Sequence, residues 1–241
     1  MSERYAVYYT PASTSALCER AAAWLGRDAF TGEVVARPEF PTLADVDLDA
    51  LTAEPRDYGF HATLKAPFEL AVGMDEDRLL AFTERFAAAR TPFEAEIAPA
   101  RMGRFLAFRL AEAIAEMDFL HHAAVRQFDV FRAPLSEFDL ARRRQTPLTA
   151  DQDARLVQWG YPYVFEEFRF HMSLTGSVAD ATVADRVLAA LKVYFADLSG
   201  SHCFDGVAVF KQESRAAPFR VLDRYGFSAV ANPGRKGVAC A

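Results

Sequence analysis

The sequence Phe60-His61-Ala62-Thr63-Leu64 is repeated in outline at Phe170-His171-Met172-Ser173-Leu174. Both stretches follow the pattern Phe-His-x-Ser/Thr-Leu. Successive side chains of a β-strand point to opposite faces, so each histidine shares a face with the hydroxyl residue two places on. The flanking Phe and Leu share the other face. Each stretch therefore predicts a strand with an apolar face that packs on helices and a polar face that lines a cleft.

The elements around each motif follow the same order. We expect a strand, a helix and two further strands at 60–70, 74–89, 93–97 and 105–110, and again at 168–174, 183–195, 204–210 and 219–225. The offset is nearly constant, 110 residues from 61 to 171 and 114 from 105 to 219, which indicates an internal duplication. Helices that alternate with antiparallel strand pairs predict the α+β class. We expect one two-lobed domain over residues 1–241, with motif blocks at about 58–110 and 165–226 around a central cleft.

The remaining segments carry weaker patterns. Residues 4–10 predict an opening strand, and residues 13–25 predict a helix that stops at Gly26. Residues 27–57 are predicted to be a long loop because prolines and acidic residues interrupt any period, and residues 133–148 are predicted to be a connector. One further helix is expected at 117–131, and another from Thr149 or Asp151 to Trp159. The residues after Phe227 are expected to form a loose tail.

Composition excludes several classes of protein. The 241 residues are 51% hydrophobic and 25% charged, which is typical of a well-packed globular protein. The net charge of −6 argues against binding of long nucleic acids, since that affinity needs a broad basic surface. The three cysteines are scattered without a Cys-x-x-Cys pair, which favours a reducing cytoplasm over a disulfide framework or a zinc ribbon. Neither a signal-peptide pattern nor a run of about 18 apolar residues is present, so no membrane partner is expected.

Two imidazoles and two hydroxyls on facing strands suit phosphodiester chemistry. A neutral histidine takes a proton from the attacking water and a protonated one gives a proton to the leaving alkoxide, tasks that suit an ordinary pKa of about 6.5. The hydroxyls of Thr63 and Ser173 would donate to the non-bridging phosphate oxygens. No cysteine or acid lies at metal-ligand spacing beside His61 or His171, so we expect neither a metal nor another cofactor. The alternative is that both histidines are satisfied, half-buried strand residues.

Four other side chains near the motifs are candidates for substrate binding. Lys65 falls on the histidine face by parity and would neutralise a phosphate, unless Pro67 disturbs the alternation. Arg56 and Tyr58 precede the first motif and would reach the edge of the cleft, or serve as a loop cation and a packing ring. Tyr163 precedes the second motif and would stack on a sugar or base, or pack between the lobes.

The other charged residues and histidines are given ordinary roles. Arg169 has the same parity as His171 and would either reach the cleft or pair in solvent with Glu166 or Glu167, and we expect the solvent pair. We expect the run Arg142-Arg143-Arg144 to form a solvated basic patch. The remaining histidines are expected to be structural, two on a helix and one in a loop: His121, His122 and His202.

The motifs also carry a family resemblance. The pair of His-x-Ser/Thr motifs resembles the 2H phosphoesterase superfamily, and the similarity spans most of residues 60–225. The longer strings YGFHATLKAP (58–67), WGYPY (159–163) and FRFHMSLTG (168–176) resemble the bacterial DUF1045 branch. The resemblance implies a two-lobed 2H phosphoesterase-like fold with a central cleft, the two motif histidines as acid and base, and a phosphoester substrate. This branch is associated with phosphonate operons, which implies a place in phosphonate metabolism.

The expected function is that of a metal-independent phosphoesterase acting on a small cyclic phosphate or phosphodiester. Two alternatives stay open, a non-catalytic module that binds a nucleotide or phospho-ligand, and processing of RNA 2′,3′-cyclic phosphates. The net charge of −6 weighs against a large RNA substrate. The sequence leaves open the natural substrate, which histidine is the acid and which the base, the oligomeric state, and whether residues 27–57 form a lid.

Overall fold

Two four-stranded antiparallel sheets form the centre of the fold. The structure is a computed structural model, and it describes residues 3–228. The first sheet has the strand order β2-β1-β7-β8 and the second has the order β5-β4-β3-β6. The strands are β1 (Arg4–Tyr9), β2 (Ala62–Phe68), β3 (Phe93–Met102), β4 (Phe105–Leu110), β5 (Met172–Ser173), β6 (Gly200–Phe204), β7 (Gly206–Gln212) and β8 (Arg220–Gly226). The predicted α+β class is confirmed.

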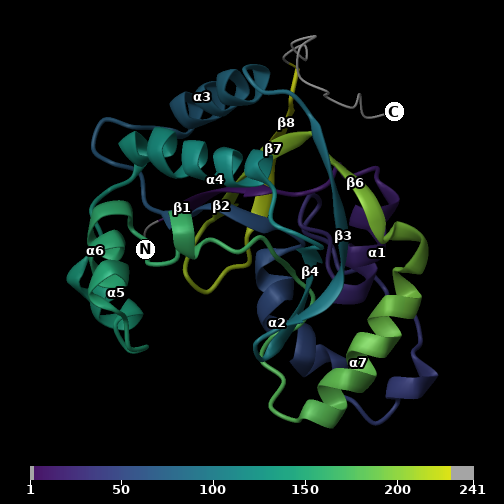
Figure 1. Ribbon diagram of the computed structural model, residues 1–241. Coiled ribbons are helices and arrows are strands. Elements are labelled where there is room, and N and C mark those ends of the chain that lie inside the picture. The colour runs from purple at the N-terminus through teal and green to yellow at the C-terminus, as the bar shows by residue number, and fades with distance from the viewer. Residues whose placement is uncertain (1–2, 229–241) are drawn as a thin grey trace.

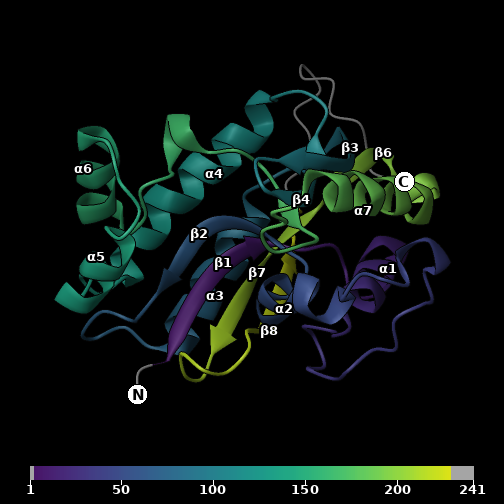
Figure 2. The ribbon, with the colours of Figure 1, turned by 90° about the horizontal axis from the view of Figure 1, so that it is seen from below.

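Seven α-helices surround the sheets within the described residues. They are α1 (Ala16–Leu25), α2 (Leu48–Tyr58), α3 (Glu76–Ala88), α4 (Ala115–Gln127), α5 (Glu137–Arg143), α6 (Ala150–Trp159) and α7 (Ala181–Tyr194). Helix α3 packs on β7 and β8, α4 packs on β2, and α7 packs on β3 and β4. Figures 1 and 2 show α5 and α6 side by side at one end of the molecule, away from α1 and α7. Between residues 3 and 228 we find no helix with the length and apolar character needed to span a lipid bilayer.

The two motif strands meet at the centre of the molecule. Strand β2 begins directly after His61, and β5 begins directly after His171. Each is the edge strand of its own sheet, and the two edge strands contact one another. The second motif forms a much shorter strand than the predicted 168–174, since only Met172–Ser173 pairs with β4. Both histidines therefore stand where a strand starts rather than inside it.

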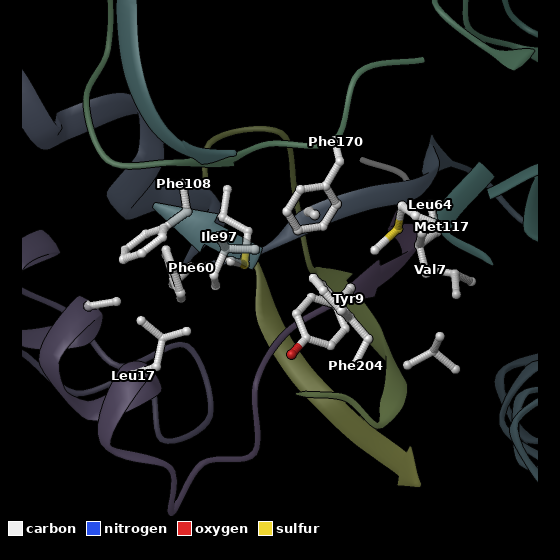
Figure 3. Close-up of a cluster of buried hydrophobic side chains, with 14 of the residues drawn as sticks. Val7, Tyr9, Leu17, Phe60, Leu64, Ile97, Phe108, Met117, Phe170 and Phe204 are labelled. Atoms are coloured by element: carbon white, nitrogen blue, oxygen red, sulfur yellow. The ribbon is translucent and has the colours of Figure 1, made fainter. Parts of the chain in front are cut away.

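The apolar faces of both motifs are buried in one shared core, as predicted. Phe60 is 4% exposed and Phe170 is 5% exposed. Figure 3 shows this core, in which Phe60 lies near Phe108 and Phe170 lies near Phe204, with ring centroids 5.9 Å and 5.3 Å apart. Burial of a phenylalanine side chain stabilises a fold by about 1.5–3 kcal/mol. Because the apolar face is buried in this core, the polar face of each motif points away from it.

The second half of the predicted loop at 27–57 is the helix α2, so the prediction was wrong there. Asp47 caps the helix with its side chain. Pro55 lacks an N–H group, which leaves the carbonyl of Leu51 without its helical donor. The N–H of Gly176 donates to that carbonyl at 2.8 Å. The proline in α2 thus frees the acceptor that ties this helix to the end of the second motif.

The internal duplication is less extensive than predicted. Strand β4, which was predicted to belong with the first motif, lies next to the second motif strand β5. Its predicted counterpart β8 lies at the edge of the first sheet opposite the first motif strand β2, so the two do not occupy equivalent places. The predicted strand 204–210 is interrupted at Asp205, because β6 belongs to the second sheet and β7 to the first. The predicted connector 133–148 contains the helix α5. The expected loose tail after Phe227 lies almost wholly outside the described residues.

Candidate active site

A cavity of about 600 Å³ opens where β2 meets β5. Residues of both motifs line it, namely His61, Thr63, His171 and Ser173. Other parts of its wall come from the end of α2, from α4, α5 and α6, and from the segment that precedes the second motif. The structure therefore brings together in one cavity the four residues that were predicted to carry the chemistry.

The same backbone contact holds both imidazoles. Nδ1 of His61 lies 2.9 Å from the carbonyl oxygen of Gly59, and Nδ1 of His171 lies 2.7 Å from that of Arg169. A carbonyl oxygen only accepts, so Nδ1 carries the hydrogen in both rings. Nε2 of each neutral ring therefore keeps its lone pair. Either ring can take up a proton at Nε2 and release it from the same atom.

Gly59, which supplies the carbonyl for His61, occupies a position that only glycine fits. Its φ angle is +77°, in the left-handed region. A Cβ at this position would overlap the side chain of Ala29. Glycine is therefore required at this position of the string YGFHATLKAP, where it sets the backbone conformation that orients His61.

The two imidazoles have different neighbours. The ring of Tyr8 stacks on His61 with centroids 3.9 Å apart and an interplanar angle of 26°, and Tyr58 stacks at 5.8 Å. Among residues 3–228, the ring that contacts His171 is that of Phe105, at 5.5 Å and a tilt of 57°. His61 is thus the more confined ring and His171 the freer one.

Burial disfavours the charged form of both histidines. It lowers the pKa of His61 to about 4, and the His171 imidazole acts in the same direction, while the bond to Gly59 raises the value. Burial likewise lowers the pKa of His171, and the positive charge of Arg109 adds to the effect. The effect of the His171 imidazole on the pKa of His61 indicates that the two rings lie within electrostatic range of each other. In the free protein both rings are neutral at pH 7.

The two motif hydroxyls stand at matching places beside the imidazoles. Oγ1 of Thr63 lies 3.4 Å from Nε2 of His61. Thr63 is paired with Tyr8 of β1 and Ser173 with Ala107 of β4, each the neighbouring strand of its sheet. Both hydroxyl side chains are half-buried and line the cavity. They are therefore available to a ligand held between the imidazoles.

Lys65 lines the cavity, but its charge is already compensated. Its side chain is 2% exposed and its Nζ donates to Oδ1 of Asp129 at 2.6 Å and to the carbonyl of Val125 at 3.1 Å. Burial lowers the pKa of Lys65 to about 8, and the carboxylate of Asp129 acts to raise it. The sequence interpretation of Lys65 as a cation reserved for phosphate is therefore corrected: it is one half of a buried ion pair.

Arg56, predicted to reach the cleft, does not line it. It belongs to the last turn of α2, where its guanidinium donates to Thr52 and pairs with Asp49 at 3.4 Å. Residues two apart on a helix point in nearly opposite directions, so Arg56 and Tyr58 cannot share a face. Tyr58 is the one that lines the cavity.

Tyr163 also lines the cavity, as predicted, and its side chain is 38% exposed. Its ring meets that of Tyr161 edge-on, with centroids 5.6 Å apart. Both residues belong to the segment between α6 and the second motif. This segment forms an aromatic part of the wall beside the motifs.

Several cavity residues were not predicted for this role. They are Tyr8 of the first strand, Phe105, His121 and Arg143. Arg169 lines the cavity too, which was the alternative to its expected pairing in solvent. The expected solvent pair of Arg169 is wrong, because Glu166 and Glu167 pair with Arg155 and Arg169 instead donates to the carbonyls of Glu166 and Phe168. His121 is buried as a structural histidine, and its Nε2 accepts from the N–H of Phe165 at 3.3 Å.

The last of the predicted structural histidines, His202, belongs to the second sheet. His202 lies in β6 rather than in a loop, with Nε2 2.5 Å from the hydroxyl of Tyr9. Among residues 3–228 no three His, Cys, Asp or Glu side chains gather into a group that would hold a metal ion.

The chain belongs to the family described as "Protein of unknown function (DUF1045)", whose profile matches residues 63–220. The predicted membership of this family is confirmed. Two proteins named ribose 1,5-bisphosphate phosphokinase PhnN are similar to it, one from Janthinobacterium sp. (strain Marseille), 38% identical, and one from Laribacter hongkongensis (strain HLHK9), 34% identical. The matches cover 93% and 90% of this chain. The chain spans about half the length of these relatives, 51% and 50%.

Solved structures with a similar outline are more distant. The crystal structure of TT0787 of Thermus thermophilus is 15% identical and gives a TM-score of 0.44, over 95% of this chain and 98% of that one. The crystal structure of E. coli LigT complexed with 3′-AMP is 11% identical and gives a TM-score of 0.43, over 95% of this chain and 100% of that one.

Proposed function

We propose that this protein is a phosphoesterase that hydrolyses a small cyclic phosphate or phosphodiester, with His61 and His171 as general acid and general base. One observation carries the proposal: two imidazoles from separate motifs line one cavity, and each has Nδ1 held by a backbone carbonyl so that Nε2 is left for proton transfer. Acid–base catalysis needs a proton acceptor and a proton donor on either side of the reacting phosphorus.

The proposed reaction is a single displacement by water. The neutral histidine removes a proton from water at Nε2 while the water oxygen bonds to phosphorus. The bond from phosphorus to the leaving oxygen breaks, and the protonated histidine gives its Nε2 proton to that oxygen. A cyclic diester thus becomes a phosphomonoester with one free hydroxyl. The hydroxyls of Thr63 and Ser173 donate to the non-bridging oxygens, where they stabilise the transition state.

Because the pKa values of both histidines are lowered in the free protein, the substrate itself has to promote protonation of one of them. The pKa of His61 is about 4 in the free protein, so the general acid has to gain its proton when the substrate binds. The negative charge of a phosphodiester beside an imidazole favours the protonated form. The proposal therefore couples substrate binding to protonation of one histidine.

The names of the relatives support a sugar phosphate as the substrate and a role in phosphonate metabolism. They name ribose 1,5-bisphosphate, a sugar that carries two phosphates, and this chain matches about half of each relative. The phosphokinase activity is not proposed for this chain. Its sequence contains no G-x-x-x-x-G-K-[S/T] loop of the kind that cradles nucleotide phosphates.

The test is a panel of cyclic nucleotides, sugar cyclic phosphates and phosphonate-pathway intermediates, assayed with EDTA present. We expect release of a phosphomonoester from at least one member at a rate that EDTA leaves unchanged. Binding without turnover would instead favour the phospho-ligand module, to which the neutral histidines are also suited. Turnover confined to RNA ends would favour RNA processing, and strict metal dependence would contradict the histidine mechanism.

A further inference from the structure

The run Arg142-Arg143-Arg144 contains two surface cations and one that faces the cavity. Arg142 pairs with Asp139 at 3.8 Å and Arg144 pairs with Asp153 at 2.7 Å. Arg143, the last residue of α5, lines the cavity. Consecutive helical residues point about 100° apart, which explains how one of three neighbours faces inward. The expectation of a solvated patch therefore holds for the outer two arginines only.

Arg143 has no carboxylate partner in the described part of the chain. None lies within 4.0 Å of its guanidinium between residues 3 and 228. The guanidinium instead lies over the ring of Tyr161, 4.8 Å from its centroid. A cation that faces a cavity without an ion-pair partner is available to an anionic ligand.

Tyr8 and Tyr161 line the same cavity as this cation. Tyr8 is 1% exposed and lines the cavity, and its hydroxyl makes no hydrogen bond to any residue that the structure describes. Burial raises the pKa of Tyr8 well above its usual range, while the charges of Arg4 and Arg143 act to lower it. Burial also raises the pKa of Tyr161, and Arg143 again acts to lower it. Both hydroxyls therefore lie within electrostatic range of Arg143.

The other charges of the cavity do not neutralise this group. Lys65 is paired with Asp129, and Glu167 is paired with Arg155 at 3.7 Å. Glu54 also lines the cavity, and its side chain approaches Gly176 at the end of the second motif. Arg4, behind Tyr8, is bonded to the uncharged Gln212 and adds positive charge. The Arg143 region of the cavity thus has a net positive character.

The geometry points to a second anion subsite, in which Arg143 and the hydroxyls of Tyr8 and Tyr161 bind a phosphomonoester group. Tyr8 stacks on His61, so this subsite lies one tyrosine ring away from the proposed reaction centre. The inference rests on the proposed function, and it specifies the substrate as a small sugar that carries a separate phosphate beside the phosphodiester to be cleaved. A phosphomonoester offers three acceptor oxygens to the guanidinium and hydroxyl donors.

Two measurements test the subsite, and the first does not depend on turnover. Calorimetry with ribose 5-phosphate as the probe compares the wild type with Arg143→Gln and with the matched controls Arg142→Gln and Arg144→Gln. We expect about a tenfold or greater loss of affinity for Arg143→Gln and none for the controls, since charge-assisted hydrogen bonds are lost in the first variant alone. Equal affinity of Arg143→Gln and the wild type would overturn the subsite.

The second measurement uses adenosine 2′,3′-cyclic phosphate with and without a 5′-phosphate, and a pentose cyclic phosphate with and without a second phosphate. We expect kcat/KM of the wild type to favour the phosphorylated member by about tenfold or more, and Arg143→Gln to reduce this ratio to about one. A ratio unchanged by Arg143→Gln overturns the subsite and leaves the phosphoesterase proposal intact. Arg143-dependent binding without any turnover supports the subsite and contradicts the phosphoesterase proposal.

Discussion

The imidazole of His171 is held as the imidazole of His61 is held, with Nδ1 within 2.9 Å of the carbonyl oxygen two residues earlier in the chain. The two residues directly precede the edge strands of different sheets, yet both present Nε2 for proton transfer in one cavity. An orientation fixed by the backbone needs no reorganisation when a substrate binds, which favours catalysis.

The first prediction concerns the protonation of His61. In the free protein its ring should titrate with a pKa of about 4, because burial disfavours the charged form. Addition of inorganic phosphate or vanadate should raise the pKa of at least one of the two cavity histidines, since the bound anion favours imidazolium. A pH titration followed by NMR of the ring protons measures both values. An unperturbed value for His61 near 6.5 in the free protein would contradict the burial described for it.

The same pKa shift makes stability depend on pH. The unfolded His61 titrates at about 6.5 and the folded one at about 4, so unfolding takes up a proton between these values. The contribution of His61 to stability is thus complete above pH 6.5 and is lost as the pH falls towards 4. Urea unfolding at pH 7, 6 and 5 should show a smaller decline for His61→Leu than for the wild type. Parallel curves for the two proteins would refute the prediction.

The second prediction concerns the motif hydroxyls. Thr63→Val and Ser173→Ala should each lower kcat by about 10²-fold, because each removes a donor to the transition-state oxygens. The control is Thr83→Val on α3, a buried threonine whose hydroxyl donates to the carbonyl of Leu79. Steady-state kinetics with circular dichroism of each variant would separate activity from folding. The hydroxyls would have no catalytic role if both cavity variants behaved like the control.

The third prediction concerns the buried pair Lys65–Asp129. Asp129→Ala leaves an ammonium that is 2% exposed without its carboxylate, and should lower the free energy of unfolding by about 3–5 kcal/mol. Lys65→Met should cost less, because Asp129 keeps its contact with Arg132 at 2.8 Å. Urea denaturation of the two variants gives the comparison. A small loss of stability in both variants, together with a large rise in KM for Lys65→Met, would contradict the structural role and indicate that Lys65 binds phosphate.

The parts of the site that local pattern determines could be predicted from the sequence. The alternation of Phe60, His61 and Ala62 survives folding because the large apolar side chains have to be buried on one face. Gly59 likewise follows from backbone geometry, although its role at His61 emerges only in three dimensions. Periodicity within about ten residues is therefore sufficient to identify the motif residues.

The parts that depend on long-range contacts could not be predicted. The sequence predicts Arg56 at the edge of the cleft because residues 27–57 have the pattern of a loop. In the structure Arg56 belongs to the helix α2, and its side chain does not line the cavity. Nothing in the pattern of Arg142-Arg143-Arg144 distinguishes the middle residue, since its placement depends on where α5 packs. Tyr8 lies in β1, whose six residues are all buried, so no alternation marks a cavity side. Such residues are recognised only once the sheets are assembled.

The central claim is that His61 and His171 act as a pair in phosphoester hydrolysis. Single-turnover rates, with EDTA present and the best substrate of the cyclic phosphate panel, test it most directly in His61→Ala, His171→Ala and the double variant. Each single variant should be slower by about 10²–10⁴-fold while it keeps the fold, and the double variant should be little slower than the singles, because acid and base act in one step. Near-wild-type rates in both single variants would contradict the claim.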